Sequence, residues 1–180
     1  MAITLISAAV VFGRVIIEVM VVASGVASEV LPPLVAMMVL AGIIAVAAYR
    51  FSLKSEPPSP GDTPPSELKG AVMFGLIYVV VLLAVSFARE HFGQTGLFTV
   101  AALSGLTDMD AITLSTASLS QAGQLDASTA WRVIMTGGLA NLLFKAALVI
   151  GMGSRVFIKP VILGFAAMLT GGAAILAFWP

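Results

Sequence analysis

A chain of 180 residues with 59% hydrophobic and only 10% charged residues differs from a water-soluble domain, in which about a quarter of the residues carry charge. A chain this short must expose a large surface, so the surface has to face lipid, and the composition predicts an all-α integral membrane protein. Nine basic and nine acidic residues cancel, which argues against nucleic acid as a partner, and one histidine with no cysteine excludes thiolate and multi-histidine metal sites.

Five apolar runs are long enough to form spanning helices, since about 20 apolar residues cross the roughly 30 Å of hydrocarbon. The first run suits a retained span better than a cleaved signal. Trp131 and Trp179 stand at run ends, where indole rings favour the headgroup boundary. Glycine pairs at 137–138 and 171–172 predict close helix packing. The five runs are 3–23, 31–48, 68–88, 131–152 and 156–179.

A proline-rich stretch divides the chain into two parts. Residues 51–67 hold five prolines together with glycine, aspartate and serines, a composition typical of an exposed, non-helical linker. We therefore expect a two-span front part at 1–50 and a larger helical membrane part at 68–180.

Residues 97–121 differ from the five spans, because polar residues interrupt the apolar pattern. Ser104-Gly105 is typical of a helix C-terminus, and Thr107 with Asp110 resembles the capping box that starts a second helix. The pattern predicts one broken helix. Hydropathy leaves open whether its two pieces cross the bilayer or dip in and return.

The basic residues favour a re-entrant segment. If the broken helix returns, five basic residues share one side of the membrane and two the other, whereas a crossing divides them four against three. We therefore expect re-entry, with the linker on the cytoplasmic side of the inner (plasma) membrane. The larger group is then Arg50, Lys54, Lys69, Arg155 and Lys159, and the smaller one is Arg89 and Arg132.

Charged side chains inside the apolar runs must be paired or functional, because each costs on the order of 2.5 to 3.5 kcal/mol at the bilayer centre. Arg14 and Glu18 have the spacing of an ion pair within one helix. Lys145 has no acidic residue within a turn, so we expect it to reach Asp108 or Asp110 from a neighbouring helix. Together these charges leave an excess of one negative charge, which a cation or a proton could balance.

Two interpretations of the aspartates at the break stand side by side. A carboxylate near a helix N-terminus can cap the helix. Oxygen ligands beside a break are also what hard cations bind, and transporters place ions there. The candidate ion ligands are Asp108, Asp110, Thr107, Thr113, Ser115 and Asn141, the two aspartates being the candidate metal ligands, with Lys145, Arg14 and Glu18 as counter-charges.

One segment resembles the signature of the domain of unknown function 4010, the C-terminal membrane domain of a branch of MgtC/SapB-like proteins. Residues 103–115 of this chain have the sequence Leu-Ser-Gly-Leu-Thr-Asp-Met-Asp-Ala-Ile-Thr-Leu-Ser. Residues 140–146, Ala-Asn-Leu-Leu-Phe-Lys-Ala, and Glu67-Leu68 after the linker also resemble the family. The resemblance covers most of the chain and implies an internal repeat, in which Arg14 lies opposite Lys145.

The resemblance also implies partners and a cation. Longer relatives carry an MgtC-like membrane domain and a second broken segment before the helix that matches residues 3–23. On that layout the first half of this chain is incomplete, and a homo-oligomer or a separate membrane partner would complete it. The family name suggests magnesium-linked physiology, so Mg²⁺ is the bound cation that it implies, and we expect no organic cofactor.

The sequence contains no nucleophile and histidine pair, phosphate loop or cofactor motif, so we do not expect an enzyme. Transport or conduction of a small cation, such as magnesium or a proton, through a site at the broken helix is the leading hypothesis. The alternative is a non-transporting protein that packs against another membrane complex and regulates it. Lipid handling, a third hypothesis, would require a polar groove open to the bilayer.

Overall fold

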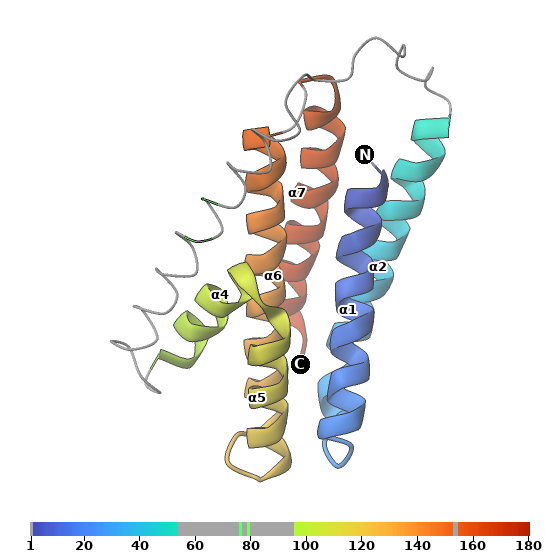
Figure 1. The fold of residues 1–180 in the computed structure, drawn as a ribbon. Coiled ribbons are helices and arrows are strands. Elements are labelled where there is room, and N and C mark those ends of the chain that lie inside the picture. The colour runs from blue at the N-terminus through green and yellow to red at the C-terminus, as the bar shows by residue number, and fades with distance from the viewer. Residues whose placement is uncertain (1, 54–75, 77–78, 80–95, 153–154) are drawn as a thin grey trace.

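The structure, a computed structural model, describes residues 2–53, 76, 79, 96–152 and 155–180. The long helices lie side by side, and the two shorter helices meet in an inverted V that packs against two of them (Figure 1). No strand occurs among the described residues. The helices are α1 (Ala2–Val22), α2 (Ala27–Leu53), α4 (Leu97–Thr107), α5 (Met109–Gln121), α6 (Ala127–Met152) and α7 (Arg155–Phe178).

Four of these helices, α1, α2, α6 and α7, are long and apolar enough to cross a membrane. They coincide with four of the five expected spans, and they support a protein that lies in the membrane in contact with lipid. The expected span at 68–88 lies outside the described residues, apart from Leu76 and Val79. Most of the expected linker lies outside them too, although α2 continues to Leu53, beyond the predicted boundary at residue 50.

The first helix is apolar on both its faces. Leu5, Phe12 and Val19 recur at helical spacing on the inner face and are fully or almost fully buried. On the outer face, Val10 and Ile17 keep 63% and 60% of their surface exposed. A helix of a water-soluble protein would carry polar side chains at these outer positions, so the exposed face of α1 suits lipid.

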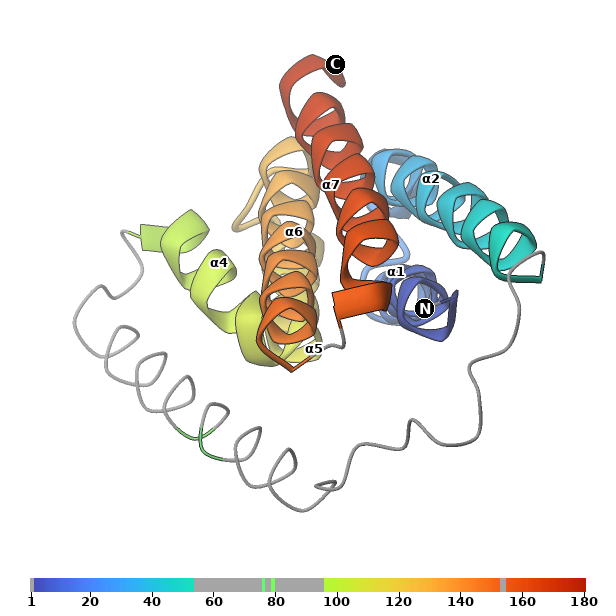
Figure 2. The ribbon, with the colours of Figure 1, turned by 90° about the horizontal axis from the view of Figure 1, so that it is seen from above.

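Glycines bring the long helices close together, as the sequence predicts. A Cβ atom added at Gly138 of α6 would lie 2.9 Å from the ring of Phe12 on α1, and one at Gly164 of α7 would lie 2.8 Å from Leu5. Gly171 of α7 meets Leu40 of α2 in the same way. Figure 2 shows the result from above, with α7 lying between α6 and α2.

The connection between α5 and α6 is built from local signals. Gly123 has a φ of 69°, and the amide of Gln124 donates to the carbonyl of Leu119 at 2.9 Å, which ends α5. The side chain of Asp126 then accepts from the amide of Thr129 at 2.7 Å and caps α6. Trp131 lies near the start of α6, which begins four residues before the predicted span, and packing leaves its indole only 2% exposed.

Candidate functional site

The broken helix is interrupted at one residue. Asp108 has an extended backbone, with φ −143° and ψ 112°, and its side chain accepts from the amide of Asp110 at 2.9 Å. Asp108 is therefore the N-cap of α5. The predicted break is present, but its details were wrong: α4 continues through Ser104-Gly105, and Thr107 is no cap, since its hydroxyl donates to the Ser104 carbonyl at 3.2 Å.

The backbone of α4 is held against α6 at Gly105. A Cβ atom added to Gly105 would collide with the backbone of Gly137 on α6, so the two helices touch through their main chains. The side-chain amide of Asn141, one turn further along α6, donates to the carbonyl of Gly105 at 3.0 Å. Asn141 therefore fixes the position of the break, a structural role that the sequence did not predict.

Asp110 forms an ion pair with Arg14 of α1. The Nη2 atom of Arg14 contacts Oδ1 of Asp110, and Nε of the same guanidinium lies 3.7 Å from Oε1 of Glu18. The carboxyl group of Glu18 also lies close to that of Asp110. The expected pair within α1 is thus one arm of a three-residue cluster, in which one guanidinium faces two carboxylates.

The cluster lies near the middle of α1. Arg14 follows Ala2 by about 18 Å and precedes Val22 by about 12 Å, at 1.5 Å per residue. Since α1 is just long enough to cross the hydrocarbon, both ends of the helix are more than about 10 Å away from the ion pair. The exposed fractions of the side chains are 55% for Arg14, 36% for Asp110 and 16% for Glu18.

Helices α1 and α5 run parallel from this cluster towards one end of the bundle. The amide of Gly25, in the turn after α1, donates to Oε1 of Gln121 at 3.0 Å. This contact and the pair of Arg14 with Asp110 both join residues that are 96 positions apart. These two contacts show that α5 runs beside α1 and leads from the cluster to the turn between α1 and α2.

The prediction that Lys145 pairs with Asp108 or Asp110 was wrong. The counter-charge of Asp110 is Arg14, and Lys145 makes no ion pair with any acidic residue that the structure describes. Lys145 is partly buried and lies within electrostatic range of Arg14. The internal repeat that the resemblance implies stays a prediction.

The remaining candidate ligands are distributed around α5. Ser115 is exposed, and its hydroxyl donates to the carbonyl of Ala111 at 2.8 Å. Thr113 is fully buried and has no hydrogen-bond partner among the described residues. Within those residues, no group of three or more histidine, cysteine or acidic side chains could hold a metal ion. Magnesium ligation by Asp108 and Asp110 therefore stays a prediction.

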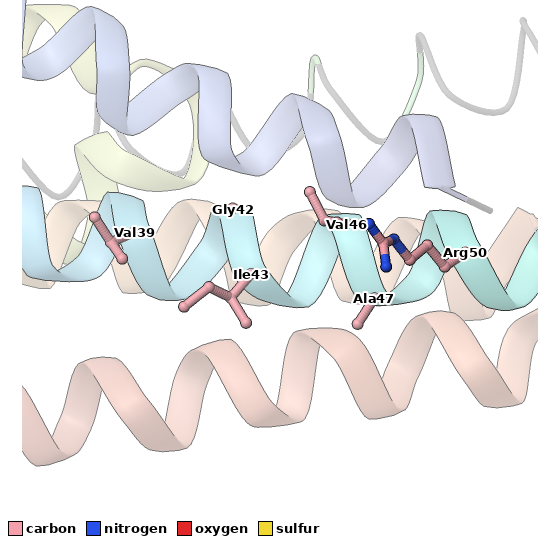
Figure 3. A pocket seen from close by; sticks show the side chains of 6 residues that line it. All are labelled: Val39, Gly42, Ile43, Val46, Ala47 and Arg50. Carbon is pink, nitrogen blue, oxygen red and sulfur yellow. The ribbon is translucent and has the colours of Figure 1, made fainter.

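An apolar groove on the outer face of α2 lies apart from this cluster (Figure 3). It has a volume of about 520 Å³ and ends at Arg50, and it contains no acidic side chain. Its other lining residues are Val39, Gly42, Ile43, Val46 and Ala47.

The family model described as Domain of unknown function (DUF4010) matches residues 1–153. The chain belongs to the DUF4010 family. The match includes the broken helix, Arg14, Glu18 and Asn141, so the whole charged cluster lies in the part that the family shares. The family match does not test the expected link to MgtC-like proteins.

A relative from Aquifex aeolicus (strain VF5) is described as an uncharacterized protein. It is 37% identical to this chain over 91 residues, which are 51% of this chain and 40% of the relative. The chain thus aligns with less than half of the relative's length. No solved structure matches this chain.

Two polar residues of α5 were missed by the sequence analysis. Thr116 and Ser120 are buried, with 1% and 3% of their surface exposed, and neither hydroxyl has a partner among the described residues. They follow Thr113 at intervals of three and four residues, which places them on the same side of a helix. That spacing was visible in the sequence and would have distinguished them from the exposed serines of the same segment.

Proposed function

We propose that this DUF4010 protein is a multi-pass protein of the inner (plasma) membrane that transports a small cation, and that Asp110 carries the cation. The observation that supports the proposal is the ion pair of Asp110 with Arg14, which lies beside a helix break and near the middle of a spanning helix. Ionisable residues at such depth mark ion or proton pathways in membrane proteins, and breaks in helices mark binding sites.

Asp110 is the aspartate that we assign to the cation, in preference to Asp108. The side chain of Asp108 already accepts a hydrogen bond as the cap of α5. Asp110 has a charged partner instead, and an incoming cation or proton can replace that partner at the carboxylate. A group that exchanges partners meets the requirement of a transport site, because binding must be reversible for the ion to leave.

Glu18 supplies the second carboxylate that Arg14 needs as a partner when a cation occupies Asp110. When a cation binds Asp110, the guanidinium of Arg14 would otherwise remain unpaired in the membrane, at a cost of several kcal/mol. The carboxylate of Glu18 is already 3.7 Å from Arg14, on the next turn of the same helix. A side-chain rotation of Arg14 towards Glu18 therefore frees Asp110 without leaving a lone positive charge.

We further propose that the segment formed by α4 and α5 is re-entrant. The V shape of these two helices and the packing of both against the same long helix, α6, support this topology (Figure 1). In a re-entrant segment the break lies at the deepest point of the membrane, and irregular backbone is tolerated there only next to protein or a water-filled cavity. The contact of Gly105 with α6 meets the first of these conditions.

Flux through proteoliposomes tests the proposal. We expect the purified protein to conduct H⁺, Na⁺, K⁺ or Mg²⁺, each assayed with its own fluorescent indicator, and we expect Asp110→Asn to lower the flux at least about tenfold. Asp126→Asn is the matched control, because Asp126 is an exposed helix cap outside the cluster, and it should retain the wild-type flux. Equal flux for wild type and Asp110→Asn, or no flux of any of these ions, would refute the proposal.

A further inference from the structure

The apolar groove on α2 has the length and the depth of one bilayer leaflet. Its lining residues run from Val39 to Arg50 at helical spacing, so they form one stripe along the helix. Val39 lies close to the middle of this spanning helix, and Arg50 lies in its last turn. At 1.5 Å per residue the stripe is about 16 Å long, which is close to half of the roughly 30 Å of hydrocarbon. The groove therefore extends from the bilayer centre to the membrane surface.

The small residues of the stripe produce the hollow. No atom lies within 4 Å of a Cβ atom added to Gly42, whereas Val39, Ile43 and Val46 next to it keep at least half of their surface exposed. The walls are apolar up to Arg50, so water in the groove would find no hydrogen-bond partner along most of its length. On a helix face that is turned towards lipid, hydrocarbon is the material that fills such a hollow.

The groove ends at a positive charge that the protein does not neutralise. Arg50 makes no ion pair or hydrogen bond with any residue that the structure describes, and none of the lining residues is acidic. A base in the last turn suits the helix dipole, but this leaves the N–H donors of the guanidinium available. Figure 3 shows the guanidinium turned back along α2 towards Val46, so the charge lies at the end of the groove.

We propose that this groove binds one acyl chain of an anionic phospholipid, whose phosphate group contacts Arg50. A guanidinium binds a phosphate through paired, charge-assisted hydrogen bonds. A lipid in its own leaflet has its phosphate at the membrane surface and the end of its chain near the bilayer centre, and the groove offers the charge and the apolar stripe at these two depths. The expected cytoplasmic position of Arg50 agrees with the proposal, because the cytoplasmic leaflet carries anionic lipids.

The lipid site is independent of the proposed transport function. It lies on α2, whereas Arg14, Glu18 and Asp110 lie on α1 and α5. A protein without cation flux would keep the lipid site, and a protein without the lipid site would keep the ion pair.

Native mass spectrometry of the purified protein in detergent tests the proposal. Dioleoyl phosphatidylglycerol, which is anionic, and dioleoyl phosphatidylcholine, which is zwitterionic, have the same chains, and the dissociation constant of the first bound molecule is measured for each. We expect the anionic lipid to bind at least about fivefold more tightly, and Arg50→Gln to remove this preference. Gly42→Leu places a side chain in the groove, so it should weaken the binding of both lipids at least about fivefold.

Two matched controls lie outside the groove. Lys159→Gln removes an exposed basic residue of α7, and Gly151→Leu adds the same side chain to a glycine of α6 whose added Cβ has no atom within 4 Å. Both variants should bind the two lipids as the wild type does. If Gly42→Leu does not elute as wild type, Ala47→Leu replaces it, because Ala47 is an exposed residue of the same groove.

Three results would overturn the lipid site. Equal affinities of the wild type for the two lipids, or a preference that Arg50→Gln leaves unchanged, would remove the contact with the phosphate. Lipid affinities that neither Gly42→Leu nor Ala47→Leu lowers would show that the acyl chain does not lie in the groove. A dimer that these substitutions dissociate, without bound lipid, would show that a second copy of the chain covers α2 instead.

Discussion

The side-chain amide of Asn141, on α6, donates to the carbonyl of Gly105, on α4, at 3.0 Å. The Gly105 carbonyl lies three residues before the extended backbone of Asp108, so this hydrogen bond fixes the point at which the broken helix meets a spanning helix. A spanning helix thereby controls the position of the helix that carries Asp110.

Replacing this amide by an apolar side chain of similar size tests that control. Asn141→Leu removes the donor and leaves the Gly105 carbonyl in an apolar contact, so we expect a loss of about 1 to 3 kcal/mol in the free energy of unfolding. Thermal unfolding in detergent measures the loss. Leu143→Ala, at a position of α6 that is 57% exposed, should change the midpoint little. Equal effects of the two substitutions would contradict a structural role for Asn141.

The substitution Gly105→Ala should distinguish the effect of close helix packing on stability from the effect of helix propensity. The new Cβ atom would collide with the backbone of Gly137, so Gly105→Ala is expected to destabilise the protein although alanine favours a helix. Gly42→Ala is the control, because no atom lies within 4 Å of its added Cβ, and it should stabilise α2 by up to about 1 kcal/mol. Opposite shifts of the unfolding midpoint are predicted; shifts of the same sign would show that α4 does not touch α6 at Gly105.

Asp108 has a capping role that can be distinguished from ion binding. Asparagine also caps helices, so Asp108→Asn should keep the stability of the wild type, while Asp108→Ala should lose about 1 kcal/mol. If Asp110 alone carries the cation, Asp108→Asn also keeps the flux. A stable Asp108→Asn protein with flux reduced as far as in Asp110→Asn would show that both carboxylates bind the ion.

Asp126, the N-cap of α6, should make the stability of the protein depend on pH. Hydrogen bonds from the Ser128 hydroxyl and the Thr129 amide lower the pKa of Asp126 below its usual value, and this carboxyl lies outside the spans. A lowered pKa in the folded state adds stability above the unfolded value of about 3.9. That stability is lost as the pH falls through the folded value. The unfolding midpoint of wild type relative to Asp126→Asn should therefore fall only below about pH 4, and a constant difference from pH 6 to pH 2 would contradict the assignment.

Four of the spans and the break could be predicted because both are local properties of the sequence. Apolar runs and a glycine- and aspartate-rich interruption are visible without knowing the neighbours of a helix. The partner of Asp110 could not be found in this way, because Arg14 and Lys145 are equally plausible cations within their own runs. Which of them faces α5 depends on how α1 and α6 pack, and that packing is set by contacts such as Phe12 with Gly138.

The ion pair of Arg14 with Asp110 is the relationship on which the proposed site depends, and the stability of neutralised variants tests it most directly. Arg14→Gln leaves the carboxylates of Asp110 and Glu18 without a counter-charge, so it should destabilise more than Asp110→Asn, after which Arg14 still faces Glu18.

The deciding measurement is the change in the free energy of unfolding that Asp110→Asn causes. It is measured by thermal unfolding at neutral pH, once in the wild-type protein and once in the Arg14→Gln variant. We predict that Asp110→Asn destabilises the wild type but stabilises the Arg14→Gln protein, by about 1 to 3 kcal/mol, because it then removes an unpaired charge. The same destabilisation in both backgrounds would mean that Arg14 and Asp110 do not interact, and would remove the basis of the site.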